Sequence, residues 1–306
     1  MLQLLPDREA SSVGLRNLIK ELLVVVLGLA AALAVVLFPK WKAAAELHGQ
    51  GPAEPFRIAG NLYFVGASDL GSFLLTGPQG HVVLDGGYPT TAPMIMASIA
   101  KLGFDIKDVK VLLNSDPGPE QAGGLTVLQQ ASGAELWASE ASADVIASGG
   151  DNPDMILPLR ALIRSGIVGY PAARVDHRFK DGDTIRVGPI ALTAHITGGY
   201  MRGCTSWSFS VRDGNRVLNV VSVCGLGVQL GMRYPGQQAD LERSFRVLRS
   251  LPVDVWVTSH GRQWGRYRKF VASKTAKNPV DPFIDPDGYR GYIDDAEAEF
   301  RQGVVH

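Results

Sequence analysis

The chain has 306 residues, of which 46% are hydrophobic and 20% charged, and its 30 basic side chains balance 30 acidic ones. This composition excludes an intrinsically disordered or collagen-like chain. Zero net charge with no long basic block argues against a nucleic-acid partner. Two cysteines are too few for a disulfide-rich scaffold or for a structural zinc site.

An uncharged apolar run, LLVVVLGLAAALAVVLF, occupies residues 22–38. At about 1.5 Å per helical residue it spans about 26 Å, close to the ~30 Å hydrocarbon core of a bilayer. We predict a transmembrane anchor or uncleaved signal, with residues 1–21 in the cytoplasm. The protein then crosses the inner membrane once, and its domain faces the periplasm. The alternative is signal cleavage near Ala43–Ala45, which releases the domain into the periplasm.

A Gly/Pro-rich linker over residues 39–55 precedes a domain over residues 56–303. Short strands between turns predict a β-meander up to Asp85. Helices over residues 92–102 and 121–131 then alternate with apolar strands over 109–114 and 134–139. This alternation indicates βα units with partly parallel strands. Residues 151–171 read as irregular. The sequence after residue 171 predicts strands over 174–224, a helix over 240–251, a strand over 253–258 and a terminal helix over 289–300.

Several segments resemble, in order, metallo-β-lactamases of the third subclass. They are NLYFVGASDLGSFLL, VVLDGG, DVKVLLNSDPGPEQAGGLTVLQQASGAELWAS, FKDGDTIRVGPIALTAHITGGYMRGCTSW, LPVDVWVTSHG and DPFIDPDGYRGYIDDAEAEF. The resemblance implies an α/β protein, an αββα sandwich of the metallo-β-lactamase fold in one domain, here preceded by one N-terminal transmembrane helix. It also implies a hydrolase that uses zinc.

The same resemblance locates a metal site whose ligands have changed. In the family, an H-x-H-x-D-H loop and two later histidines hold two zinc ions, which activate a bridging water. The matching positions here are Asp116, Gly118, Glu120, Gln121, Tyr200 and His260. Only His260 keeps the family's ligand, so five of six positions are substituted.

The substituted side chains suit zinc poorly, because glycine offers no donor and an amide or phenol binds a borderline-soft dication weakly. We therefore expect no cofactor at full occupancy, although the family implies zinc. Oxygens of Asp116 and Glu120, with Asp85, could instead hold a hard divalent cation such as calcium, magnesium or manganese. Gly225 and Gly227 stand where the family carries serine near the substrate carboxylate, so substrate recognition is also altered.

Each of these residues also has a purely structural interpretation. Asp85 can support the turn that follows its strand, and Glu120 can stabilise the start of a helix. Tyr200 can fill space, and His260 can pack.

Two functional hypotheses follow. The first is a catalytically impaired periplasmic pseudoenzyme with a degenerate zinc site, which binds a small ligand or an envelope protein. The alternative is a hydrolase of a β-lactam, amide or ester with a noncanonical metal site, for which Glu120, Tyr200 and His260 are the catalytic candidates. A purely structural envelope protein is a third alternative.

The two cysteines can pair across a hairpin. If residues 213–215 form a three-residue loop closed by Arg212 and Arg216, Cys204 and Cys224 face each other. An oxidising compartment then permits a disulfide. A β-bulge would break this register and leave two buried thiols instead.

Overall fold

The structure is a computed structural model that describes residues 19–28 and 49–304. It divides into two units, Met1–His48 and Gly49–His306. In the first, residues 19–28 are helical, with Leu22 and Leu27 exposed. The second half of the predicted membrane segment, residues 29–38, lies outside the described residues. Within the two described ranges, no helix is both long and apolar enough to span a bilayer.

The second unit contains two sheets whose strands follow each other in chain order. The first sheet has the order β1-β2-β3-β4-β5-β6-β7, antiparallel up to β4 and parallel from β4 to β7. Its strands are Phe56–Ala59, Leu62–Phe64, Phe73–Leu75, His81–Leu84, Val109–Leu113, Glu135–Ser139 and His177–Phe179.

The second sheet has the order β12-β11-β10-β9-β8, in which only the β11–β12 pair is parallel. Its strands β8 to β12 are Thr184–Val187, Ile190–Ile196, Thr205–Asp213, Arg216–Val223 and Val255–Thr258.

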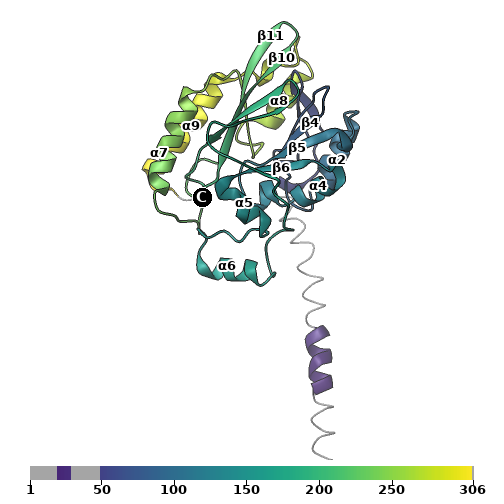
Figure 1. Cartoon of the computed structure of the whole chain (residues 1–306), viewed down its shortest axis with the longest axis vertical. Coiled ribbons are helices and arrows are strands. Elements are labelled where there is room, and N and C mark those ends of the chain that lie inside the picture. Colours follow the sequence, from purple (N-terminus) through teal and green to yellow (C-terminus); the bar gives the residue numbers. More distant parts are fainter. Residues whose placement is uncertain (1–18, 29–48, 305–306) are drawn as a thin grey trace, which may run out of the picture. The chain divides into compact units, whose positions relative to one another are not determined.

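Helices cover the outer face of each sheet (Figure 1). The α-helices of this unit are α2 Ala92–Lys101, α3 Pro119–Ala122, α4 Leu125–Ser132, α5 Glu140–Ala147, α6 Leu157–Arg164, α7 Gln237–Ser250, α8 Arg266–Ser273 and α9 Pro286–Arg301. Of these, α6 lies away from both sheets and covers neither. The unit also contains two 3₁₀ turns, η2 Ile106–Asp108 and η3 Asp281–Phe283.

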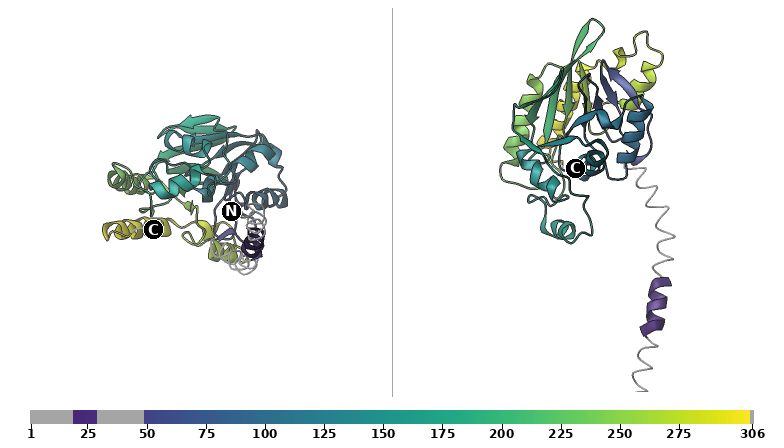
Figure 2. Two further views of the ribbon diagram at one scale, coloured as in Figure 1. Left: turned by 90° about the horizontal axis from the view of Figure 1, so that it is seen from below. Right: turned by 45° about the vertical axis from the view of Figure 1, so that its right-hand side comes forward.

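Side chains that point alternately to the two faces of a strand explain how the sheets and helices form layers. In β4, Val82 and Leu84 enter the core shared by the two sheets, whereas Val83 enters a second core with Ile95 of α2 and Leu128 of α4. Neighbouring side chains of a strand point to opposite faces, so a strand buried on both sides reads as a continuous apolar run. Figure 2 shows the layers from two further sides. The predicted αββα sandwich is confirmed.

Two helix predictions were wrong in detail. The helix predicted over residues 121–131 is split at Gly123 and Gly124 into α3 and α4. At residue 124 only glycine fits, because a Cβ there would lie 2.2 Å from the carbonyl oxygen of Gly86. The segment predicted as irregular contains α6, which has no buried residue. Its apolar side chains, Leu157, Leu159 and Leu162, are exposed.

The hairpin register was also predicted wrongly. Asp213 pairs with Arg216, which leaves a two-residue loop of Gly214 and Asn215. Gly214 has φ +59°, as a type II′ turn requires at its first central position. The predicted three-residue loop would have shifted every pair by one residue.

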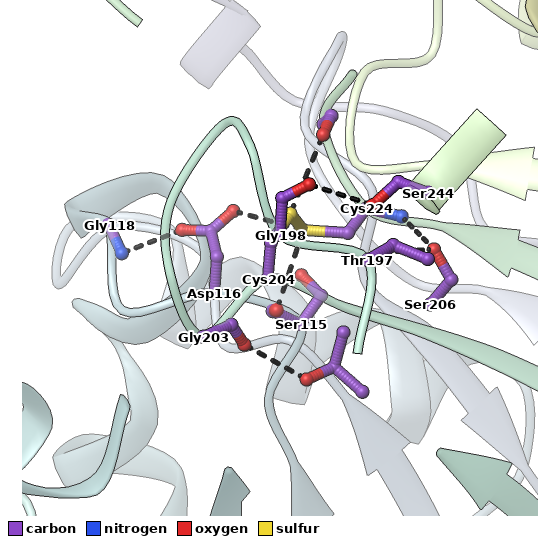
Figure 3. Close-up of a disulfide and its surroundings, with 12 residues drawn as sticks. Ser115, Asp116, Gly118, Thr197, Gly198, Gly203, Cys204, Ser206, Cys224 and Ser244 are labelled. Atoms are coloured by element: carbon purple, nitrogen blue, oxygen red, sulfur yellow. Dashed lines mark hydrogen bonds between the residues drawn. A yellow bond between two sulfur atoms is a disulfide. The ribbon is translucent and has the colours of Figure 1, made fainter. Parts of the chain in front are cut away.

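The predicted disulfide is nevertheless present, with the Cα atoms of Cys204 and Cys224 5.8 Å apart (Figure 3). Strand β10 begins at Thr205 and β11 ends at Val223. Both cysteines therefore lie just beyond the paired residues, where the ladder no longer dictates which residues face each other. The bridge joins the loop before β10 to the segment after β11.

We expect the double substitution Cys204→Ala with Cys224→Ala to lower the free energy of unfolding by about 3 kcal/mol, because the bridge closes a loop of 20 residues in the unfolded chain. Chemical denaturation of the full-length chain measures this, and the reduced wild-type chain is the control. Two free thiols titrated in denaturant without reductant would contradict the bridge.

Candidate active-site cleft

A cleft of about 400 Å³ opens where the loops after β5, β11 and β12 meet helix α9. The loop after β5 contributes Asp116, and the loop after β12 contributes His260. Tyr292 of α9 forms part of the opposite wall. Four of the six ligand positions, Asp116, Gln121, Tyr200 and His260, thus line one cleft together with Gly225, whereas Gly118 and Glu120 are not part of its lining.

His260 lies between two carboxylates. Its Nε2 atom is 3.3 Å from Oε2 of Glu120, and its Nδ1 atom is 3.6 Å from Oδ2 of Asp69. Burial opposes a charge on the imidazole, but the two carboxylates outweigh it and raise the pKa of His260 to about 9. At neutral pH the side chain is therefore an imidazolium that bridges two anions.

Asp69 organises the loop that carries His260. Its Oδ1 atom accepts a hydrogen bond of 2.6 Å from the backbone N–H of Arg262, and its Oδ2 atom lies 2.9 Å from the Arg262 guanidinium. The carbonyl oxygen of Asp69 accepts a further bond from the N–H of Gly261. One aspartate thus fixes both the backbone path and the charge of this loop.

Glu120 lies in the first turn of α3, where a carboxylate interacts favourably with the helix dipole. Its Oε1 atom accepts a hydrogen bond of 2.9 Å from the hydroxyl of Tyr88. Burial raises the pKa of Glu120, but His260 and Tyr88 outweigh it and hold that pKa below its usual value. Both carboxylate oxygens therefore already have partners.

Asp116 is only 1% exposed. Its Oδ1 atom accepts a hydrogen bond of 2.7 Å from the N–H of Gly118, at the start of α3. Its Oδ2 atom lies 3.9 Å from Sγ of Cys224 (Figure 3). Burial raises the pKa of Asp116 to about 6. Gly118 has φ −67°, a value that any residue can adopt.

Tyr200 and Gly225 fit together. A Cβ atom at Gly225 would lie 3.0 Å from the Tyr200 ring, so the absence of a side chain at 225 makes room for the aromatic ring. Tyr200 fills space here, and burial raises the pKa of its phenol. Gly227 lies two residues further on with φ +120°, a conformation that favours glycine.

Asp85 is buried behind the cleft in a left-handed conformation, with φ 66°. Its two carboxylate oxygens accept bonds of 2.7 Å from the N–H and the hydroxyl of Ser115. Burial raises the pKa of Asp85 to about 8, although both bonds oppose the shift. Asp85 therefore ties the end of β4 to the loop after β5, and it does not join Asp116 and Glu120 around a common point.

The donor set does not fit a zinc pair. Among the described residues, no three His, Cys, Asp or Glu side chains are placed to hold one metal ion. The ring nitrogens of His260 point in opposite directions, each toward a carboxylate, so Asp69, His260 and Glu120 lie in a row. Zinc requires three or four donors directed at one point.

Asp69, Tyr88 and Arg262 belong to the site but were not predicted from the sequence. Arg262 and Asp69 are 193 positions apart in the chain. A lone aspartate after a short strand belongs to no metal or catalytic motif. The resemblance to the family covers the segment that contains Asp69, but it assigns roles only to the ligand and substrate positions.

The family of this chain follows from its similarity to known proteins. Residues 72–260 match the model of the metallo-β-lactamase superfamily. The solved structure of the Rm3 metallo-β-lactamase is 38% identical, covers 83% of this chain and 94% of its own, and superposes with a TM-score of 0.76.

Two further structures are similar. The FEZ-1 metallo-β-lactamase from Legionella gormanii is 33% identical over 83% of this chain and 96% of its own, with a TM-score of 0.76. BJP-1, a subclass B3 enzyme of Bradyrhizobium japonicum, is 28% identical over 85% of this chain and 96% of its own, with a TM-score of 0.76. The chain therefore belongs to the metallo-β-lactamase superfamily and resembles its subclass B3.

We expect the His260 imidazole to titrate with a midpoint near pH 9. The folded state favours the protonated form, so this contribution to stability is complete below about pH 6.5 and is lost as the pH rises through about 9, on the order of 2–3 kcal/mol. NMR of the imidazole protons measures the midpoint. Glu120→Gln should lower it by about one unit, whereas the exposed Glu135→Gln should leave it unchanged. A midpoint at or below 6.5 would contradict the ion pairs.

Proposed function

We propose that this protein is a membrane-anchored, periplasm-facing member of the superfamily that has lost zinc-dependent catalysis and uses its altered cleft to bind a small ligand or an envelope protein. The apolar run over residues 22–38 supports the anchor. The cleft volume of about 400 Å³ supports binding.

One observation carries the loss of catalysis: the one histidine retained at a ligand position is already held by Glu120 and Asp69. A zinc ligand must offer a neutral nitrogen lone pair. To release His260 for a metal, the site would have to break both ion pairs and remove a proton from the ring. The remaining positions offer a buried carboxylate, an amide and a phenol in place of imidazoles.

The first test is metal content. The full-length chain, purified without chelator and dialysed after loading with zinc, should retain far less than one zinc per chain, because its donors are too few and do not converge. Penicillin and carbapenem hydrolysis with added zinc should stay at background. Stoichiometric zinc would refute the proposal. Turnover of a β-lactam, amide or ester that disappears in His260→Ala would establish the hydrolase alternative instead.

A second test rebuilds the ligands. We expect the five-fold variant Asp116→His, Gly118→His, Glu120→Asp, Gln121→His and Tyr200→His to take up zinc. The φ of Gly118 accepts a side chain, and the atom nearest to its new Cβ belongs to Asp116, which is itself replaced.

Zinc uptake by this variant should exceed β-lactam turnover, because groups that orient the imidazoles contribute about 10–100-fold and are not restored. Metal analysis after dialysis measures the uptake, with the wild-type chain as control. A well-folded variant that binds no zinc would show that the loop path itself has changed.

A further inference from the structure

The cleft carries an excess of negative charge. Its lining and the side chains paired with that lining include five carboxylates and two cations. Asp116, Asp295 and Glu299 line the cleft with His260 and Arg262, and Asp69 and Glu120 are paired with these two cations. Both cations are already engaged by Asp69 and Glu120. An anionic ligand would meet repulsion here without finding a free positive group.

Asp116 has an unsatisfied oxygen at the buried end of the cleft. Its Oδ1 atom accepts the Gly118 N–H, but its Oδ2 atom has as its nearest polar neighbour the sulfur of Cys224 at 3.9 Å. That sulfur belongs to a disulfide and carries no hydrogen, so it cannot donate. Because Asp116 is only 1% exposed, a carboxylate oxygen without a donor is costly there unless a ligand supplies one.

Asp295 provides a second free carboxylate at the exposed end. It lies on α9 and lines the cleft. Within the described part of the chain it has neither a hydrogen-bond nor an ion-pair partner. Its neighbour Asp294, in contrast, is paired with Arg249 at 2.6 Å. The two free carboxylates therefore belong to one cleft, although they come from distant segments.

The remaining wall is apolar and aromatic. Tyr200, Leu226, Tyr292 and Ala296 line it. The Tyr292 ring is stacked on Trp256, with the ring centroids 5.3 Å apart, which fixes its orientation. Aromatic faces attract cations, and apolar side chains bury the hydrocarbon part of a ligand.

We infer that the cleft binds an organic cation: an amine whose ammonium group donates to Asp116 and whose small apolar body packs against Tyr200 and Leu226. This inference rests on the proposed binding function and names its ligand class. A divalent metal is a poorer occupant, because hard cations require about six oxygens around one point and the carboxylates here do not converge.

Three probes of nearly the same shape separate charge from size: benzylamine, benzyl alcohol and benzoate. Isothermal titration of the full-length chain in detergent micelles, at neutral pH and low salt, should show benzylamine binding about tenfold or more tightly than benzyl alcohol. Benzoate should not bind detectably. High salt should weaken only the amine.

Matched variants assign the contacts. Asp116→Asn keeps an oxygen that accepts the Gly118 N–H but removes the charge, and it should weaken benzylamine binding about tenfold while leaving benzyl alcohol unchanged. Asp295→Asn should weaken it about two- to threefold, because the carboxylate is exposed. Asp294→Asn, next in the chain but paired with Arg249, is the control and should have no effect.

Benzoate or benzyl alcohol binding as tightly as benzylamine would overturn the inference, and so would an unchanged amine affinity in both Asp116→Asn and Asp295→Asn. Tight calcium binding that displaces the amine would also overturn it. A chain that binds no amine and hydrolyses no β-lactam refutes only this inference. Zinc-dependent turnover together with amine binding refutes only the proposed loss of catalysis.

Discussion

An imidazolium held between Glu120 and Asp69 joins three segments that are distant in the chain: the loop between β2 and β3, helix α3 and the loop after β12. Two ion pairs to His260, which keeps the family's ligand type, therefore connect these segments. Hydrogen bonds from the N–H groups of Gly261 and Arg262 to Asp69 hold the same loops together. The geometry of the cleft therefore depends on the ion pairs and on these two bonds.

Two substitutions relative to the family compensate each other in side-chain volume. The family's histidine is replaced by the larger Tyr200, and its serine by Gly225, whose missing Cβ leaves space for the ring. The Cys204–Cys224 bridge lies beside this pair and joins the segment of Tyr200 to the segment of Gly225. Tyrosine, glycine and disulfide thus form one compensated unit, in which a change to any member would leave the others poorly packed.

Much of the fold could be predicted from the sequence, because strands such as Val82–Val83–Leu84 and the stripe of helix α9 carry strong apolar patterns. The resemblance then located the cleft. The role of His260 could not be predicted, because it depends on a contact with Asp69 across the fold that no local pattern encodes. The hairpin register failed for a local reason: two turn types that differ by one residue fit the same Asp213-Gly214-Asn215 sequence.

Charge balance connects these observations. A metal centre would bring positive charge to the loops, and its carboxylate ligand would be neutralised by coordination. Asp116 replaces an imidazole of the family's motif with a carboxylate, and Glu120 replaces its aspartate, so the loop gains one negative charge. The protein compensates by retaining a proton on His260 and by pairing Arg262 with Asp69. Asp116 is not paired with either cation, and although the charge on His260 lowers its pKa, burial outweighs this effect and raises that pKa to about 6. The site therefore keeps one buried carboxylate that a ligand or a proton can neutralise.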